Sequence, residues 1–252
     1  MDINTLNLIF KEKLKEKVLG TFSKTCDPAF IEIMGYAGLD FVIIDMEHAT
    51  NNMQTIQNLI RAAQIGNIFP IVRVKNCYGN EISEVLDIGA GGVQIPMITT
   101  KTEAEEVINK IKFFPKGNRG ICRYVRSACY SGKDRFKYIK DSNEAITVLQ
   151  IEGEKGIENI DEILSVKGID IIFIGPYDLS QSLGLIGQTS HPLVEEKMLD
   201  VVKKCNEKNI YVGTFVDNVS DIAKWHNKGV KYIPCSTDVG MFYESIQQLV
   251  NQ

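Results

Sequence analysis

The 252-residue sequence predicts a (β/α)8 TIM barrel, a ring of eight parallel strands surrounded by helices. Three observations favour this fold. Short β-branched runs alternate with segments of helical periodicity, the runs number eight, and they are apolar almost throughout. Parallel strands that are buried on both faces have such continuous apolar runs. We therefore expect residues 1–252 to form a single barrel domain.

Eight runs are the predicted strands, and helices are expected between them. The runs are VLGTFS (18–23), FVIIDM (41–46), FPIVRV (69–74), GGVQIP (91–96), AITVLQIE (145–152), IDIIFIG (169–175), IYVGTFV (210–216) and VKYIPCS (230–236). Asp27 and Pro28 mark one helix start, and Thr100 precedes a second helix over residues 101–112. A doubly wound sheet is the alternative, but no G-x-G-x-x-G follows the first run and no Walker loop occurs.

Composition and charge exclude several classes of protein. The chain is 44% hydrophobic and 24% charged with a formal net charge of -4, so it has no general attraction for nucleic acid or anionic membranes. No apolar run approaches the ~18 residues of a membrane span, and the amino-terminal MDINTLNLIFKEKLKEKVLG does not resemble a signal peptide. The six cysteines are dispersed without a C-x-x-C pair, which favours reduced thiols. We expect a cytoplasmic protein.

One basic segment, residues 113–143, is too long for a simple connection, and a short helix is expected in it near 133–140. Long insertions in barrels usually cap the active face, so we expect it there. It suggests contact with an anionic substrate or another subunit, or else a solvated basic face; it lacks the interleaved aromatic residues that bind single-stranded nucleic acid. Its basic residues are Lys116, Arg119, Arg123, Arg126, Lys133, Arg135 and Lys137.

Candidate site residues stand at or just after the ends of several predicted strands, at the rim where barrel enzymes build their sites. They are Asp45 and His48 at the second strand, Arg73 at the third, Gln150 and Glu152 at the fifth, and Gly175, Pro176, Tyr177 and Asp178 at the sixth. Glu152 and Asp178 end consecutive strands joined by helix-length sequence, so both emerge on one rim and a divalent-metal site is plausible. Alternatively, Asp178 caps a helix and His48 is an ordinary loop histidine.

In these segments the sequence resembles the HpcH/HpaI aldolase family, metal-dependent class II 2-keto-3-deoxy acid aldolases that share a superfamily with citrate lyase β-subunits. The resemblance runs from DPAFIEIMGYAGLDFVIIDMEHA through FPIVRV, GAGGVQIPMI and FPKGNRG to LQIE and IFIGPYDLSQSLGLIGQTSHP. It covers most of the chain in family order and spacing. The D-x-E-H and G-P-x-D-L-S segments together make it specific.

The resemblance implies a role for each rim residue. Glu152 and Asp178 match the family's metal ligands, His48 its catalytic base, Asp45 the acid that supports this histidine, and Arg73 the cation near the substrate's keto oxygen. Gln150 matches a polar neighbour of the metal, and the main chain from Gly175 through Pro176 and Tyr177 to Asp178 matches the turn that receives the substrate carboxylate. Tyr177 departs from the family, whose best-known members have a small residue there.

The implied reaction is the reversible cleavage of a 4-hydroxy-2-oxo acid to pyruvate and an aldehyde. Two carboxylates suit Mg2+ or Mn2+, with Co2+ as a further candidate, and leave positions for a chelating 2-oxo acid. Asp45, three residues before His48, is expected to contact the imidazole and fix its tautomer. The resemblance also implies a homo-oligomer, a hexamer built as a trimer of dimers in which the carboxy-terminal helix packs on, or is exchanged with, a neighbouring subunit. The apolar spacing in VGMFYESIQQLVNQ fits this packing and fits packing on its own barrel equally well.

Three alternatives stay open at this point. A lysine Schiff base is disfavoured because Lys75 lies beyond the third strand and Lys231 lies at the wrong end of the eighth. An acyl-CoA lyase of the malyl-CoA or citrate lyase type is the second enzyme hypothesis, although no additional domain for so large a substrate is evident. The third is a catalytically silent barrel that acts as a binding module.

Overall fold

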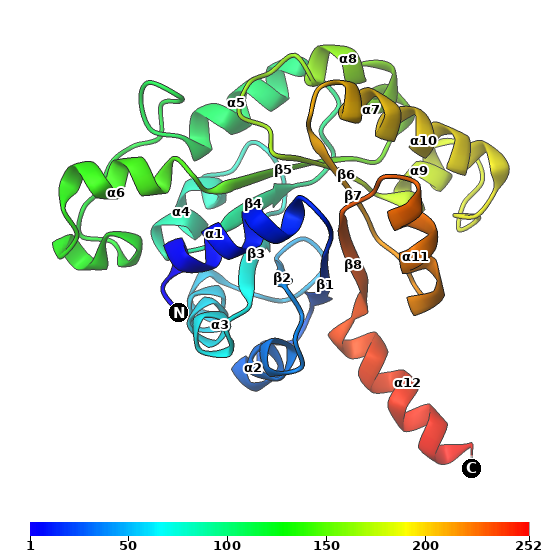
Figure 1. Cartoon of the computed structure of the whole chain (residues 1–252), viewed down its shortest axis with the longest axis horizontal. Coiled ribbons are helices and arrows are strands. Elements are labelled where there is room, and N and C mark those ends of the chain that lie inside the picture. Colours follow the sequence, from blue (N-terminus) through cyan, green and yellow to red (C-terminus); the bar gives the residue numbers. More distant parts are fainter. Residues whose placement is uncertain (252) are drawn as a thin grey trace.

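The computed structural model describes residues 1–251 and confirms the predicted barrel (Figure 1). Eight parallel strands pair in chain order, and β8 closes the ring by pairing with β1. A doubly wound sheet is thereby excluded, and each predicted run contains or overlaps one strand. The strands are β1 (Val18–Ser23), β2 (Phe41–Asp45), β3 (Phe69–Arg73), β4 (Gly92–Ile95), β5 (Ile146–Ile151), β6 (Ile171–Ile174), β7 (Tyr211–Thr214) and β8 (Tyr232–Thr237).

Helices alternate with the strands and begin where the sequence supplies capping residues. Asp27 caps α2, with Pro28 at the first helical position, and Thr100 forms a capping box with Glu103 at the start of α5. Both helix starts were predicted. The helices between β1 and β5 are α2 (Pro28–Tyr36), α3 (Met53–Gly66), α4 (Glu81–Asp87), α5 (Lys101–Ile111) and α6 (Arg135–Ser142). Those after β5 are α7 (Glu154–Glu158), α8 (Ile160–Ile163), α9 (Pro176–Ser182), α10 (Pro192–Glu207), α11 (Val219–Asn227) and α12 (Asp238–Val250).

Alternate residues of each strand pack into two apolar clusters. Along β2, Phe41 and Ile43 join the cluster that fills the barrel, whereas Val42 and Ile44 join the larger cluster between barrel and helices. All four side chains are fully buried. This burial on both faces explains why the strands are apolar almost throughout, and it makes the ring a rigid support for the residues at its rim.

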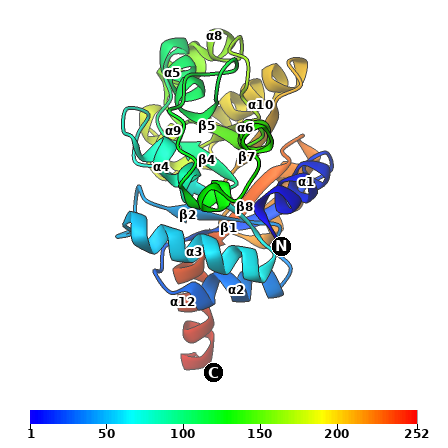
Figure 2. The same cartoon turned by 90° about the vertical axis from the view of Figure 1, so that its left-hand side faces the viewer.

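The amino-terminal helix α1 (Ile3–Leu14) closes the base of the barrel, meaning the end at which the strands begin. Its Leu6, Phe10 and Leu14 are buried in the interior cluster, and the Phe10 ring stacks on Phe69 at a centroid distance of 4.3 Å. Figures 1 and 2 show α1 lying against the strands. These apolar side chains fill the base end of the barrel interior.

The basic insertion lies on a different face from the one expected. Residues 113–143 connect α5 to β5, so they run past the base of the barrel and contribute none of the residues that line the cavities at the carboxyl rim. The prediction that the insertion caps the active face and contacts the substrate there is therefore wrong for a site within one chain. The short helix predicted near 133–140 is present as α6, preceded by a 3-10 segment, η1 (Arg126–Ser131).

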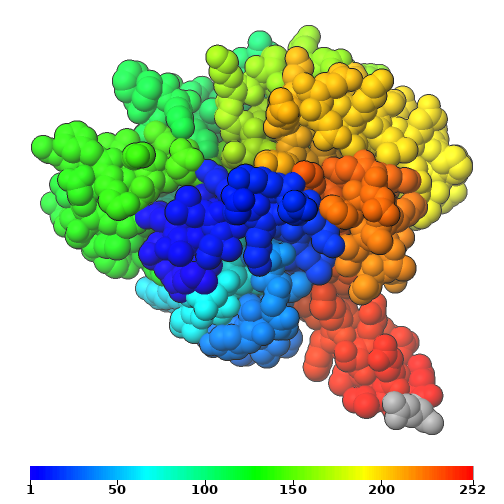
Figure 3. Space-filling model, viewed as in Figure 1, coloured from blue at the N-terminus to red at the C-terminus, as the bar shows by residue number. Residues whose placement is uncertain are grey.

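The carboxy-terminal helix α12 projects away from the barrel (Figures 1 to 3). Several apolar side chains along it are exposed, namely Val239, Met241, Phe242, Tyr243, Ile246, Leu249 and Val250. The helix expected at this end is present, and its exchange between subunits stays a prediction. Across residues 1–251, none of the helices combines the length and the apolarity that crossing a bilayer requires.

Candidate active site

Two adjoining cavities of about 450 and 300 Å³ open at the carboxyl rim of the barrel. The first is lined by eight of the nine residues that the sequence singled out: His48, Arg73, Gln150, Glu152, Gly175, Pro176, Tyr177 and Asp178. His48, Glu152 and Asp178 also line the second cavity, where Glu47 and Met97 join them. The ninth residue, Asp45, lies behind Arg73 and is fully buried. The structure thus brings eight residues that the sequence singled out to one cavity, and their roles stay a prediction.

Arg73 is fixed at the end of β3 by a bidentate ion pair with Asp45 at the end of β2. Its Nε and Nη2 donate to Oδ1 and Oδ2 of Asp45 at 2.9 and 2.8 Å, and Lys24 Nζ donates to the same Oδ2 at 2.6 Å. Burial alone would raise the pKa of Asp45, but the hydrogen bonds and charges of Arg73 and Lys24 outweigh it and lower the pKa to about 2. Asp45 is therefore a permanent anion that holds two cations at the cavity.

The expected contact between Asp45 and His48 is absent, so that prediction is wrong. Both carboxylate oxygens of Asp45 are occupied by Arg73, Lys24 and the Glu47 backbone N–H, while the His48 side chain is 64% exposed. The acid beside the imidazole is Glu47, whose Oε2 lies 3.9 Å from His48 Nε2 and 3.0 Å from Arg73 Nη1. The physical reason is that the β2–β3 register pairs Asp45 with Arg73, and this bidentate pairing outcompetes a single bond to a loop histidine.

Glu152 is held in one orientation by a chain of hydrogen bonds across the barrel interior. Its Oε1 accepts from the Met97 backbone N–H at 2.8 Å, and its Oε2 accepts from Gln150 Nε2. Gln150 Oε1 in turn accepts from Gln94 Nε2 at 2.6 Å, and the buried Tyr232 hydroxyl donates to Gln94 Oε1 at 3.3 Å. Since every member has a partner, the chain fixes the carboxylate without leaving a buried polar group unpaired.

Gly175 brings the end of β6 against Glu152. A Cβ built on this glycine would lie 2.6 Å from Glu152 Oε2 and 2.8 Å from its Cβ, so any side chain here would displace the carboxylate. The α9 helix begins directly afterwards, and its third residue is Asp178, whose side chain is exposed to both cavities. Asp178 is not the helix cap, because Gly175 occupies that position. Glu152 and Asp178 thus line the same cavities from adjacent strands.

Neighbouring negative charges and burial make it unfavourable for Glu152 and Glu47 to ionise. A divalent cation bound beside them would reduce this repulsion. Burial, followed by the charges of Asp178 and Glu47, raises the pKa of Glu152 to about 7 despite the Gln150 hydrogen bond. Burial also raises the pKa of Glu47. Within residues 1–251 no three His, Cys, Asp or Glu side chains are grouped as a metal site. The carboxylates of Glu152 and Asp178, which line the same cavities, are oxygen donors of the kind that hard divalent cations prefer.

Tyr177 lines the larger cavity together with Phe215 and Asp217. Its hydroxyl donates to Asp217 Oδ1 at 2.8 Å, and its ring lies 6.2 Å from that of Phe215, centroid to centroid. Burial and the Asp217 carboxylate raise the pKa of Tyr177 to about 12, so the phenol stays protonated and keeps this hydrogen bond. The residue that departs from the family pattern therefore helps to close the cavity.

Several residues of the site were not singled out from the sequence, among them Lys24, Glu47, Gln94 and Tyr232. Lys24 follows the first strand and Glu47 lies between Asp45 and His48, so both follow strand ends as the recognised residues do. Gln94 was visible as an amide within an apolar run, whereas nothing in the sequence marks Tyr232, which reaches the network from the far side of the barrel interior.

Comparisons with known proteins agree with this geometry. The model of the HpcH/HpaI aldolase/citrate lyase family matches residues 19–245. A hydroxypyruvate/pyruvate aldolase from Roseobacter denitrificans is 32% identical over 92% of this chain and 91% of its own length. A 5-keto-4-deoxy-D-glucarate aldolase from Shigella boydii is 31% identical over 94% of this chain and 92% of its own length.

Solved structures share the barrel. Citrate synthase SbnG is 30% identical, with a TM-score of 0.87 over 97% of this chain and 95% of that chain. A citrate lyase β subunit from Mycobacterium tuberculosis, complexed with oxaloacetate and magnesium, is 12% identical with a TM-score of 0.59 over 89% and 93% of the two chains, a likeness of fold alone. The family model covers nearly the whole barrel, and two curated relatives exceed 30% identity along almost their full lengths. The chain therefore belongs to the HpcH/HpaI aldolase/citrate lyase family.

Proposed function

We propose that this protein is a divalent-metal-dependent pyruvate aldolase that reversibly cleaves a 4-hydroxy-2-oxo acid or 2-keto-3-deoxy acid to pyruvate and an aldehyde. The observation that carries the proposal is the meeting of Glu152, Asp178, Arg73 and His48 around one cavity. Relatives named as hydroxypyruvate/pyruvate and 5-keto-4-deoxy-D-glucarate aldolases support it, because both names describe chemistry on 2-oxo acids.

Glu152 and Asp178 would hold the metal, Mg2+, Mn2+ or Co2+, since carboxylate oxygens suit hard cations. When bound, such a cation polarises the 2-oxo group and stabilises negative charge that develops on the pyruvate fragment. The hydrogen bonds from Met97 and Gln150 leave the Glu152 oxygens oriented in advance, so binding costs little reorganisation. Gln150 thereby acts through Glu152.

Arg73 would stabilise the developing enolate. Cleavage of the C3–C4 bond leaves its electron pair on the pyruvate fragment, and negative charge accumulates on the former keto oxygen. Asp45 already occupies Nε and Nη2 of Arg73, so Nη1, 3.0 Å from Glu47 Oε2, is the donor that faces the remaining acid and the cavity. Because the guanidinium is held at two points before substrate arrives, it requires no reorientation during the reaction.

His48 would take the proton of the C4 hydroxyl, directly or through a water molecule. Its exposed imidazole lines both cavities, and neutral imidazole is a competent base near pH 7. In the synthetic direction the same group returns the proton to the new alkoxide. The substrate carboxylate would lie against the main chain from Gly175 to Asp178, where the first intrahelical bond of α9 runs from Leu179 N–H to Gly175 O.

The test is release of pyruvate from a short 4-hydroxy-2-oxo acid, followed by coupled reduction of the pyruvate. We expect turnover with Mg2+, Mn2+ or Co2+, loss of turnover in chelator, and no inactivation by borohydride in the presence of substrate. His48→Ala should abolish turnover while Mn2+ binding is retained. Full activity in chelator, or borohydride trapping, would overturn the metal mechanism, and an inactive wild-type protein on a panel of 2-oxo acids would favour the silent barrel.

A second candidate is a reaction of the citrate lyase or malyl-CoA lyase type. The similarity to citrate synthase SbnG favours it, since that protein is 30% identical over nearly its whole length. Its carbon–carbon chemistry also produces an enolate, so Arg73 and the two carboxylates would have the same tasks. Cleavage of malyl-CoA in preference to the 4-hydroxy-2-oxo acid would establish this alternative.

We further propose that the chain assembles into a homo-oligomer, a hexamer built as a trimer of dimers. What supports it here is α12, which projects from the barrel (Figure 3). Several of its apolar side chains are exposed. Exposed apolar surface of this kind is typical of subunit interfaces.

A further inference from the structure

A second cavity system lies at the base of the barrel, on the face opposite the candidate active site. An outer hollow of about 350 Å³ adjoins a small inner one of about 40 Å³, and the two share Ile3, Gly89, Ser127 and Lys133 among their lining residues. We name them together the base cavity. Its walls are α1, the turn before β4 and the insertion, and Figure 3 shows the blue and green surfaces of α1 and the insertion meeting on this face.

The outer hollow of the base cavity is lined by two cations and one acid. Arg126 and Lys133 line the outer hollow, where Asp2 is the one acidic lining residue. The Asp2 carboxylate is already occupied as the cap of α1, since it accepts from Asn4 and Thr5. Arg126 donates only to neutral oxygens, those of Ile88 and Gln64. Burial, and then the charge of Arg61, lower the pKa of Arg126, as expected for a cation that lacks a counter-ion.

Two buried polar atoms at the inner hollow have no hydrogen-bond partner among the described residues. They are Oγ of Ser127 and Nε of Arg119. Arg119 is buried, with a relative exposure of 7%. Its Nη2 donates to Asp87, whereas its Nε has no partner among the described residues. Buried donors almost always have a hydrogen-bond partner in folded proteins, so the lack of a partner for these two atoms requires an explanation. Water would satisfy the hydroxyl, but it would leave Arg126, which donates only to neutral oxygens, without an anionic partner.

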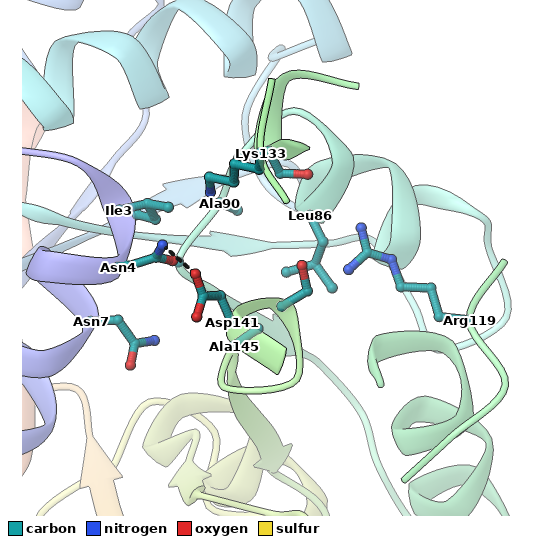
Figure 4. Close-up of a pocket in the computed structure, with 13 residues that line it drawn as sticks. Ile3, Asn4, Asn7, Leu86, Ala90, Arg119, Lys133, Asp141 and Ala145 are labelled. Carbon is teal, nitrogen blue, oxygen red and sulfur yellow. Dashed lines mark hydrogen bonds between the residues drawn. The ribbon is translucent and has the colours of Figure 1, made fainter. Parts of the chain in front are cut away.

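The close-up of the inner hollow shows how these groups are placed (Figure 4). Arg119 lies on one side and Asn4 and Asn7 of α1 on the other, with Lys133 above them. Asp141, the acid at this hollow, is already engaged by Asn4 Nδ2 at 2.8 Å and by Lys137 Nζ at 2.9 Å. Asn7 Nδ2 likewise donates to the Glu144 carbonyl, so the donors left over at this hollow are Arg119 Nε and Ser127 Oγ, beside the Lys133 ammonium. An oxyanion with several acceptor oxygens can accept from donors of this kind.

We propose that the base cavity is a phosphate-binding site, in which Lys133, Arg126 and Ser127 hold the oxyanion. The outer hollow is larger than inorganic phosphate needs, so the occupant is a phosphate monoester whose organic part lies between α1 and η1. This site is separate from the candidate active site, because none of its lining residues lines the cavities at the carboxyl rim. The proposal therefore does not depend on the reaction that the rim performs.

Calorimetric titration of the intact, metal-free protein in chelator tests the site, with inorganic phosphate and glycerol 3-phosphate as probes and acetate at equal ionic strength as the control anion. We expect saturable binding of both phosphates, tighter for the ester, and none of acetate. Lys133→Met should weaken phosphate binding roughly tenfold or more, as loss of a charge-assisted bond does. Ser127→Ala should weaken it less, because the hydroxyl is neutral.

Two further variants distinguish the base cavity from other cationic surfaces. Lys140→Met removes an exposed lysine of α6 outside the cavity and should leave affinity unchanged. Arg73→Met removes the rim cation and should also leave it unchanged. Thermal unfolding of each variant shows whether it is folded. Failure of the folded wild-type protein to bind either phosphate, equal affinity in Lys133→Met, or loss of binding in Arg73→Met would each overturn the assignment.

Discussion

Both carboxylate oxygens of Asp45, at the end of β2, accept hydrogen bonds from Arg73, at the end of β3. Asp45 therefore positions Arg73 and does not contact His48. Asp45 is fully buried, and Lys24 adds a second cation to it. The arrangement assigns Asp45 a positioning role for Arg73. It leaves Glu47 as the acid nearest the histidine.

Asp45→Asn should destabilise the protein by about 3 kcal/mol, because it leaves the buried Arg73 without an anionic partner. Urea unfolding near pH 7 measures this. Asp45 has a folded pKa of about 2 against an unfolded value of 3.8, so its contribution is fully present above pH 3.8 and is lost as the pH falls through 2. The variant should also lower kcat through Arg73.

Glu47→Gln is the matched control for this assignment, since it neutralises the neighbouring acid while Asp45 and its bidentate pair with Arg73 stay intact. If Asp45 instead supported His48, Asp45→Asn would shift the acidic limb of the pH–rate profile and leave Arg73 in place. An Asp45→Asn variant as stable as the wild type, with only that limb displaced, would contradict the positioning role.

Metal affinity should decrease as the pH is lowered below about 7, because Glu152 must lose a proton before it can act as a ligand. Its folded pKa of about 7 means that one proton is released per metal bound near pH 6, and affinity drops up to tenfold per pH unit there. Titration of Mn2+ in buffers of different ionisation enthalpy counts that proton. A pH-independent affinity between 5 and 7 would contradict the raised pKa.

The raised pKa of Glu152 also makes the stability of the metal-free protein depend on pH, in the opposite direction to metal affinity. A carboxyl whose pKa is raised on folding binds more protons in the folded state, so its contribution to stability decreases as the pH rises from 4.5 through 7. Saturating Mn2+ should remove this decrease. Thermal unfolding with and without metal across that range separates the Glu152 effect from other titrations.

The sequence could predict the barrel and the place of its site because both depend on local signals. Continuous apolar runs mark buried parallel strands, and a polar residue directly after such a run must lie at the carboxyl rim. Glu152, Asp178, Arg73 and His48 were located by this rule, without any knowledge of their contacts. The rule also applied to Lys24 and Glu47, which were overlooked beside more familiar residues.

Contacts between side chains were harder to predict, because they depend on strand register and on the barrel interior. Asp45 is three residues from His48 in sequence, yet the β2–β3 register places it opposite Arg73. The Tyr232 hydroxyl on β8 bonds to Gln94 on β4 across the barrel interior. No local sequence pattern predicts a contact between two residues so far apart in the chain. The insertion was assigned to the wrong face because its length was considered without asking whether it follows a strand or a helix.

Tyr177 should limit the size of the aldehyde that the cavity accepts. Tyr177→Ala removes the wall beside Phe215, and the preference for a bulky over a small acceptor, as a ratio of kcat/KM values, should rise roughly tenfold. Tyr177→Phe keeps the ring and removes only the bond to Asp217, so it should leave that ratio near the wild-type value. Since Tyr177 is 46% exposed, neither change should unfold the protein. Equal ratios for both variants would show that the wall lies elsewhere.

Assembly should depend on the apolar side chains of α12. Leu249 is 67% exposed and belongs to neither of the two apolar clusters of the barrel, so Leu249→Asp should leave the circular dichroism spectrum unchanged while it weakens association. We expect the mass measured by light scattering to fall from that of a hexamer toward smaller species as protein is diluted, because a buried charge without a partner opposes interface formation. Gln248→Asp is the matched control, since it adds the same charge at the adjacent exposed polar position and should preserve the mass. If Leu249→Asp keeps the wild-type mass at all concentrations, this part of α12 does not lie in the interface; a monomeric wild type would refute the hexamer itself.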